Sequence, residues 1–191
     1  MTTIARHIDR GGLEHLRGLE GAIWEGYGSI WPTANGFLES PAFLVTNSCK
    51  LSIGTVTEYF DIDGEEFSFS SIQISEAGSE LDRARNEGNV YYQNKGEQIN
   101  QVLVLRETLR ATYEGNLFFE VDFDFGIVLV RSNSVIAISK RGFHGDDFVV
   151  SSAPSMGELE LFDSSKEWSQ SLMMHYEFGR ELIKINDLLK N

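Results

Sequence analysis

The sequence predicts an α+β domain: a mainly antiparallel sheet of sequential hairpins, with helices near the N- and C-termini. Polar and apolar residues alternate through much of residues 42–162, which is typical of strands with one buried face. No helix of useful length separates residues 50 from 74, or 101 from 139, so parallel pairing is disfavoured. The 191 residues suit a single domain.

The N-terminal segment 11–30 is predicted to be helical. Its apolar residues recur at helical spacing: Leu13, Leu16, Ile23, Trp24 and Tyr27. Gly18, Gly21 and Gly26 each weaken a helix by about 1 kcal/mol relative to Ala. The following WPTANG, 31–36, is predicted to be a loop because it contains a proline and an Asn-Gly turn signal.

The β-rich segment 42–162 contains strand patterns bounded by turn signals. DIDG at 61–64 predicts a hairpin turn, and the chain turns again at Glu114-Gly115 and at 131–134. A short exposed helix is predicted over 79–86. The predicted strands are Ala42–Thr46, Leu51–Phe60, Glu65–Ile74, Gln101–Tyr113, Phe118–Val130, Val135–Ser139, Phe148–Ser151 and Leu159–Phe162.

The C-terminal segment 164–191 carries an ambiguous pattern. Trp168, Leu172 and Tyr176 are spaced i, i+4, i+8, which favours a helix over 164–177. Residues 178–190 fit either a helix or a strand, because RELIKI also alternates.

The chain is strongly acidic. Its 16 Lys and Arg against 29 Asp and Glu give a formal charge of −13. Nucleic acid binding depends on cations that neutralise phosphates, and no basic run is present, so we expect no nucleic-acid partner. The charge would attract a basic protein, although it would also serve solubility alone.

Cysteine content and hydropathy indicate the compartment. Cys49 is the single cysteine, so no intrachain disulfide can form, and a structural thiol is favoured over a nucleophile. The N-terminus lacks the apolar region of a signal peptide, and no apolar run approaches the roughly 20 residues of a membrane-spanning helix. We therefore expect a cytoplasmic protein without a membrane partner.

The stretch FFEVDFDFG, 118–126, places Glu120, Asp122 and Asp124 on one face of a strand. Its four apolar partners on the other face are Phe119, Val121, Phe123 and Phe125. The three carboxylates, called the acidic row below, could form a solvated sheet face, recognise a basic partner or bind a cation. Metal binding is the weakest of these interpretations, because one strand supplies a row of ligands and no convergence.

The loop GFHGDDF, 142–148, places His144 beside Asp146 and Asp147. A histidine near two carboxylates can act as a base or a ligand, although Gly and Asp are also ordinary turn residues. DIDGEE at 61–66 resembles part of a calcium loop, but it connects two strand patterns, so a hairpin turn is favoured.

Other features lower the expectation of an enzyme. The chain contains none of the motifs GxxxxGK[ST], GxGxxG, HExxH, GxSxG and CxxC. Trp24, Tyr27 and Trp31 lie close together, which fits a core more often than an interface. No cofactor or metal is expected.

The second half of the chain resembles the small acidic immunity proteins that neutralise bacterial toxins. The resemblance covers residues 101–185 and rests on the order of QVLVLRETLRATYEG, FFEVDFDFGIVLV, VIAISKRG, FVVSSAP and YEFGRELIKI. It implies an α+β domain that binds a toxin protein, commonly a basic one when the toxin is a nuclease. No binding residue can be carried over from the family.

Two functions are therefore predicted. The first is a non-catalytic cytosolic interaction domain, most concretely an immunity-type inhibitor that blocks a toxin through an acidic surface. Its predicted partner-binding residues are Glu120, Asp122, Asp124, Asp146 and Asp147. The alternative is a small hydrolase, metal-dependent or acid–base, that uses His144, Asp146 and Asp147.

Overall fold

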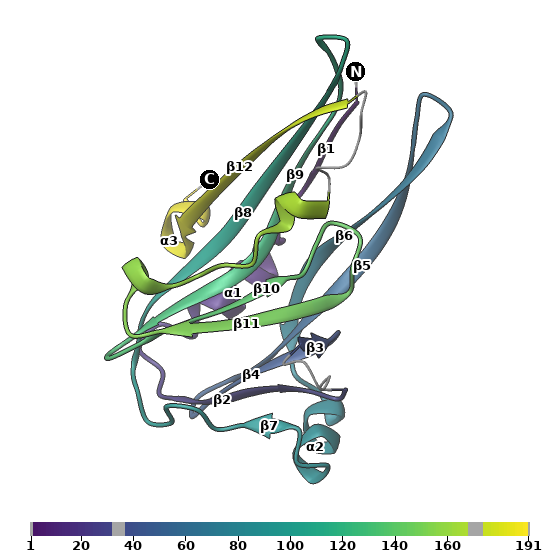
Figure 1. Cartoon of the computed structure of the whole chain (residues 1–191). Coiled ribbons are helices and arrows are strands. Elements are labelled where there is room, and N and C mark those ends of the chain that lie inside the picture. Colours follow the sequence, from purple (N-terminus) through teal and green to yellow (C-terminus); the bar gives the residue numbers. More distant parts are fainter. Residues whose placement is uncertain (1, 32–36, 168–173, 191) are drawn as a thin grey trace.

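The computed structural model describes residues 2–31, 37–167 and 174–190, which form two mainly antiparallel sheets with a few short helices (Figure 1). The larger sheet contains β1 (Thr2–Arg6), β3 (Phe37–Glu39), β8 (Ile99–Tyr113), β9 (Asn116–Arg131), β10 (Val135–Lys140), β11 (Asp147–Ala153) and β12 (Met174–Lys184). The smaller sheet contains β2 (Trp24–Ser29), β4 (Ala42–Thr46), β5 (Lys50–Ile62), β6 (Glu65–Glu76) and β7 (Val90–Tyr91). The helices are α1 (Arg10–Arg17), α2 (Ser79–Asn86), α3 (Ile185–Leu188) and the 3-10 turns η1 (Met156–Glu158) and η2 (Ser164–Glu167).

The strand order supports the predicted class. Neighbours in the larger sheet run β12-β8-β9-β10-β11-β3, and in the smaller sheet β6-β5-β4-β2-β7. The pairing of β1 with β9 is parallel, while the other pairings of the described strands are antiparallel. A mainly antiparallel sheet of sequential hairpins combined with helices is therefore confirmed. The positions predicted for the terminal helices are not.

The hairpin predictions hold because turn chemistry and alternation agree there. β4 and α2 have the predicted bounds, and β5 and β6 pair through a turn at Asp63 and Gly64 with φ angles of 53° and 83°. Glu114 and Gly115 make the corresponding turn between β8 and β9, with φ angles of 48° and 79°. Positive φ at both central residues suits the twist of a two-residue hairpin.

The prediction of a helix over 11–30 is wrong beyond Arg17. The helix α1 begins after Asp9, whose side chain accepts a hydrogen bond from Gly12 N, and residues 24–29 form β2 instead. A Cβ on Gly26 would lie 2.3 Å from the carbonyl oxygen of Tyr91. The glycine therefore allows β7 to pair closely with β2, which a helical reading of the segment cannot reveal. The predicted loop at 31–36 lies outside the described residues except for Trp31.

The prediction of a helix over 164–177 is also wrong in the described part. Ser164–Glu167 is a 3-10 turn, and β12 starts at Met174; residues 168–173 lie outside the described residues. A spacing of four residues keeps side chains on one face of a strand as well as of a helix. The long β8 offers an edge along which β12 pairs from Met174 to Lys184, and this pairing decides between the two. Within the segment RELIKI, β12 continues up to Lys184, and α3 begins at Ile185.

The predicted strand Leu159–Phe162 is absent. This segment follows η1 without pairing to a strand, and the Phe162 carbonyl accepts a hydrogen bond from the Arg180 guanidinium at 2.7 Å. Leu161 is half-buried against the core. A short apolar run here covers the sheet rather than extending it.

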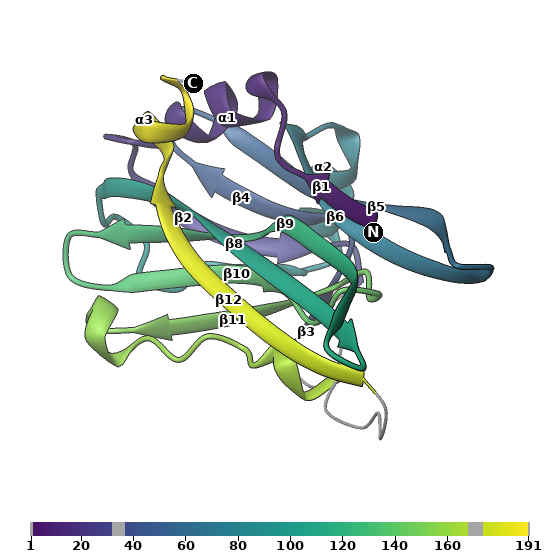
Figure 2. The same cartoon turned by 90° about the horizontal axis from the view of Figure 1, so that it is seen from above.

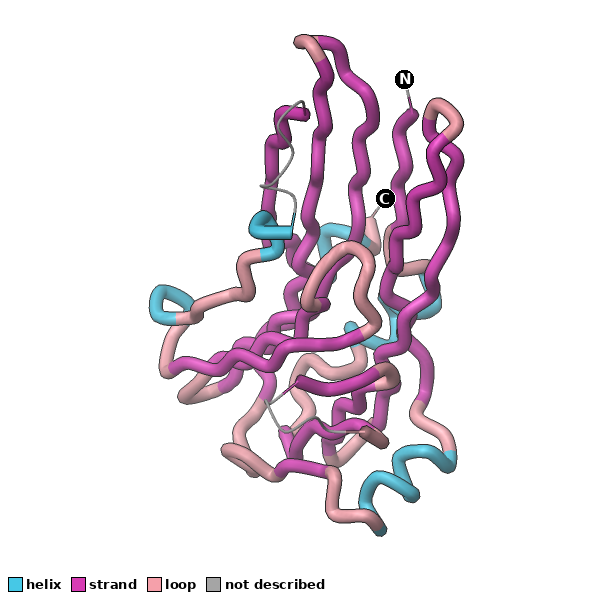
Figure 3. Tube along the Cα trace, turned by 45° about the vertical axis from the view of Figure 1, so that its right-hand side comes forward, coloured by secondary structure: helices cyan, strands magenta, loops and turns pink. Residues whose placement is uncertain are grey.

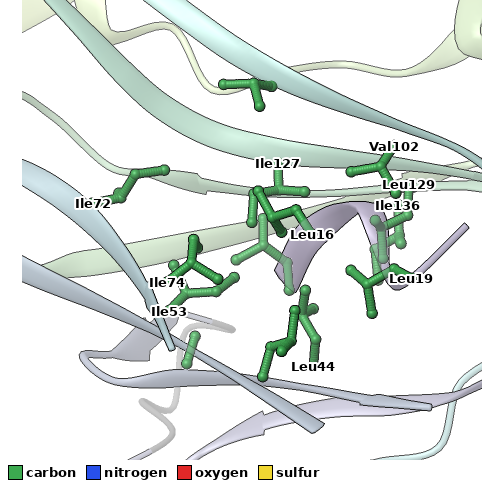
Figure 4. Close-up of a cluster of buried hydrophobic side chains, with 14 of the residues drawn as sticks. Leu16, Leu19, Leu44, Ile53, Ile72, Ile74, Val102, Ile127, Leu129 and Ile136 are labelled. Atoms are coloured by element: carbon green, nitrogen blue, oxygen red, sulfur yellow. The ribbon is translucent and has the colours of Figure 1, made fainter. Parts of the chain in front are cut away.

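The main core lies between the sheets, and α1 fills the gap on one side (Figure 4). Leu16 and Leu19 pack between Val102 and Ile127 of the larger sheet and Ile53 of the smaller one. Helix α3 lies beside α1 (Figure 2) and adds the buried Ile185 to the same cluster.

A second core is rich in phenylalanine and joins two arms. The β5–β6 and β8–β9 hairpins extend towards the same end of the molecule, with β1 between them (Figure 3). The ring of Phe67 lies 5.4 Å from that of Phe119, and the ring of Phe69 lies 5.9 Å from that of Phe123. The arms therefore form a stiff support for the residues that they present.

Candidate functional site

The acidic row lies on β9 as the alternation predicted. Phe119, Val121, Phe123 and Phe125 are all buried in the phenylalanine-rich core. The opposite face carries Glu120, Asp122 and Asp124. Asp124 differs from the other two because it is only 1% exposed.

Basic side chains of the same chain contact the row. Asp124 accepts hydrogen bonds from Arg106 Nε and from the Ile8 backbone N–H, both at 2.8 Å. Glu120 pairs with Arg110 at 2.8 Å, and Asp122 lies 3.2 Å from His7 Nε2. The row is therefore engaged in contacts within the chain, two of them arginine–carboxylate ion pairs, and is not an open acidic surface.

The β8–β9 register explains this pairing. Arg110 lies opposite Glu120, and Arg106 lies opposite Asp124, because the register that starts at the Glu114-Gly115 turn shifts by one residue between Ala111 and Thr112. Opposite charges facing each other across two strands stabilise the pair. Counting back from the turn alone would place Phe119 opposite Arg110, so the sequence does not reveal this pairing. The contribution of His7 depends on the parallel pairing of β1.

The loop residues contact other elements. Asp147 pairs with Arg141 at 3.6 Å, while the exposed Asp146 accepts a hydrogen bond from the Thr57 hydroxyl of β5 at 3.3 Å. The contacts of the acidic row, in contrast, are with β8 and the β1–α1 connection. The structure therefore does not show the five predicted partner-binding residues sharing one set of contacts.

His144 is exposed and lies against β6. Its ring stacks on Phe69 with the centroids 5.5 Å apart, and Nδ1 donates a hydrogen bond to the Ser68 carbonyl. Asp146 and Asp147 have the partners described above. Among the described residues, no group of three or more His, Cys, Asp or Glu side chains is arranged to hold a metal ion.

The β5–β6 hairpin carries an acidic cluster that the sequence analysis did not single out. Residues 51–82 contain eight carboxylates and no Lys, Arg or His. Four of the eight stand around the turn and define the acidic tip: Asp61, Asp63, Glu65 and Glu66. None of the ion pairs among the described residues involves the acidic tip. The sequence could have revealed this cluster, because residues 51–82 form a long segment without a basic residue.

The acidic tip is presented on a fixed base. Phe60 and Phe67 pack half-buried against the phenylalanine-rich core, and Arg6 of β1 forms a double hydrogen bond with Glu58 of β5. This hydrogen bonding to Glu58 raises the pKa of Arg6. Tyr59, beside the tip, is 68% exposed. The hairpin therefore combines unpaired negative charge with an exposed aromatic ring.

A polar cleft lies at the base of this hairpin. Its volume is about 440 Å³, and Arg6, His7 and Asp9 form one wall against β5 and β6. Each of these three side chains already has a partner: Glu58, Asp122 and the Gly12 N–H, respectively. The cleft can admit a polar group, but its charges are largely satisfied within the chain.

The aromatic segment 24–31 divides between core and surface. Trp24 is fully buried, as predicted, whereas Trp31 is 52% exposed with the Arg83 guanidinium 4.9 Å from its ring centroid. Cys49 is half-buried and lies 3.4 Å from the Thr46 hydroxyl.

Comparisons with family models, with curated proteins and with solved structures give no match. Within the described parts of the chain, no helix combines the length and apolarity needed to cross a membrane.

Proposed function

We propose that this protein is a non-catalytic interaction domain that binds a basic protein through the acidic tip of the β5–β6 hairpin. In its most concrete form it is an immunity-type inhibitor that occludes the active site of a toxin. The observation that supports this proposal is the gathering of four carboxylates without ion pairs at the end of a projecting hairpin.

Charge supports a basic partner. The chain carries −13, and the 51–82 segment alone contributes −8 of it. Complementary charge steers diffusional encounter and raises the association rate, most strongly where the charges project from the surface. Carboxylates that already pair with arginines contribute less, so the acidic tip is favoured over the acidic row as the contact.

Tyr59 supplies the second element of an interface. Exposed tyrosines on a rigid support are common anchors, because they bury a large area at a low cost in conformational entropy. Tyr59 fits this role, since the hairpin beneath it packs against β9. Glu120, Asp122, Asp124, Asp146 and Asp147 remain predicted contributors to the same negative field.

The experiment compares two charge variants of the full chain. The tip variant carries Asp61→Asn, Asp63→Asn, Glu65→Gln and Glu66→Gln. The control variant removes the same number of exposed carboxylates elsewhere through Glu80→Gln, Glu114→Gln, Glu160→Gln and Glu181→Gln. Both variants lose the same number of negative charges. A difference between their association rates therefore reports where on the surface the charges matter.

The binding partner is isolated from the native cell with the wild-type chain and then purified. Stopped-flow association is measured for the three proteins over a range of salt concentrations. We expect the tip variant to associate at least about tenfold more slowly than the control and to lose most of its salt dependence. Equal rates for the two variants would remove the tip from the interface, and a partner without basic character would refute the electrostatic mechanism.

A further inference from the structure

The outer edge of β12 has no strand neighbour among the described residues. β12 pairs with β8 on one side, and no other described strand pairs with it. None of its residues from Met174 to Lys184 is buried, and Phe178 and Leu182 are 38% and 37% exposed. Natural proteins usually shorten or cover such edges, because the free N–H and C=O groups accept another strand.

Two copies of the same edge can pair only in certain registers. An antiparallel pair of identical strands has a two-fold axis perpendicular to the sheet, so each residue faces one from the same side of the partner's strand. The β12–β8 register places Met174, Tyr176, Phe178, Arg180 and Leu182 on one side of the sheet, and His175, Glu177, Gly179 and Glu181 on the other. Residues on the same side of a strand are an even number of positions apart. The two-fold axis lies midway between two facing positions, so it passes through a residue.

Repulsion between like charges excludes most of the registers that pair a long part of the two β12 strands. An axis through Glu177, Arg180 or Glu181 places that residue opposite its own copy, and like charges directly opposite each other destabilise a sheet. An axis through Gly179 places Glu177 opposite the partner's Glu181. Among the registers centred between Glu177 and Glu181, the one centred on Phe178 remains.

The register centred on Phe178 is complementary along its length. Phe178 meets its own copy, Met174 faces the partner's Leu182, and Tyr176 faces the partner's Arg180. On the other side of the sheet, His175 faces the partner's Glu181. Apolar residues thus face apolar residues, and no like charges are opposed.

We propose that β12 pairs with β12 of a second copy in this register, which makes one sheet continuous across a two-fold dimer. The inference is independent of the proposed function, because β12 and the acidic tip are different elements. Each copy carries −13, so the two repel each other at long range. Salt screens this repulsion. Dimerisation should therefore strengthen with salt, whereas binding of a basic partner should weaken.

The first test is sedimentation equilibrium of the wild-type chain at low and high salt. We expect the weight-average mass to rise towards that of a dimer with protein concentration, and to rise further with salt. Phe178→Glu places like charges on the axis and should yield a monomer, while Tyr59→Glu adds the same charge at another exposed aromatic residue and should leave the dimer intact.

The second test locates the axis. Phe178→Cys and, as a control, Tyr59→Cys are each made with Cys49→Ser, so that the introduced thiol is the only one. Directly opposed residues meet the geometry of a disulfide, so mild oxidation should link Phe178→Cys into dimers much faster than Tyr59→Cys. Equal rates would overturn the register. A wild-type chain that stays monomeric up to about 1 mM would overturn the dimer, and this measurement decides even if a variant fails to fold.

Discussion

Asp124 on β9 lies opposite Arg106 on β8, and Arg106 Nε donates a hydrogen bond to its carboxylate at 2.8 Å. The second carboxylate oxygen accepts the Ile8 N–H. Asp124 thus joins the two central strands to the connection between β1 and α1. A residue that looked like part of a binding surface is a buried structural link.

Replacement of this link should be costly. We expect Asp124→Ala to reduce the free energy of unfolding by about 3–5 kcal/mol, because it leaves Arg106 without its buried partner. Chemical denaturation measures the change. The control Glu120→Gln affects the exposed pair with Arg110 and should cost less than about 1 kcal/mol. Similar losses in the two variants would contradict the structural role of Asp124.

The buried Glu107 should make stability depend on pH. Burial raises its pKa above the ordinary 4.5, although hydrogen bonding from Ser164 and the charge of Arg180 oppose the rise. The native state therefore holds this proton more tightly than the unfolded state. The stabilisation is complete below the ordinary pKa and is lost as the pH rises through the raised value.

Glu107→Gln removes this titration. Urea denaturation of both proteins from acidic to neutral pH should show the wild type losing stability relative to Glu107→Gln as the pH rises above 4.5, and then a constant difference. A difference that changes in the opposite direction would show that the pKa of Glu107 is lowered in the native state.

Two strand glycines should respond differently to alanine. A Cβ on Gly126 would lie 2.7 Å from the Ile138 carbonyl oxygen, whereas a Cβ on Gly54 would meet no described atom within 4 Å. We expect Gly126→Ala to cost about 1–3 kcal/mol, because β9 and β10 must move apart. Gly54→Ala should be neutral in the same thermal unfolding assay. Equal stabilities of the two variants would mean that β10 moves away from β9 without a loss of stability.

Tyr59 is expected to anchor the partner. Tyr59→Ala should weaken partner binding by about 1–2 kcal/mol, since exposed tyrosines at interfaces often contribute this much. Its thermal stability should stay close to that of the wild type because the side chain is 68% exposed. Tyr92→Ala, at a 53% exposed tyrosine directly after β7, is the matched control for calorimetry. Identical affinities for the two variants would exclude Tyr59 from the interface.

The alternation in 118–125 predicted the strand β9 and its buried face correctly, because one buried face imposes a period of two. It did not predict what covers the other face. The arginines that pair with Glu120 and Asp124 come from β8, and His7 directly follows β1, a strand more than a hundred residues away in the sequence. Local pattern contains no information about such a parallel partner.

Helical spacing of apolar residues did not predict the bounds of the helices at either end of the chain. The 11–30 pattern spans α1 and then β2, where Gly26 permits the close approach of β7. In the predicted helix 164–177, residues four apart fit either element, and from Met174 onwards the edge of β8 decides in favour of the strand. In both segments, pairing with a distant strand outweighs the local preference.

The sequence by itself determined the antiparallel hairpins, because turn residues such as Asp63-Gly64 and the alternation beside them act within a few residues of each other. Only the tertiary structure decided which carboxylates remain unpaired. Asp124 and Asp61 are chemically alike, but Asp124 meets Arg106 across a strand pair, while Asp61 stands at the tip of a hairpin and takes part in none of the ion pairs among the described residues. The difference arises because an ion pair depends on distance in space, which a linear pattern does not encode.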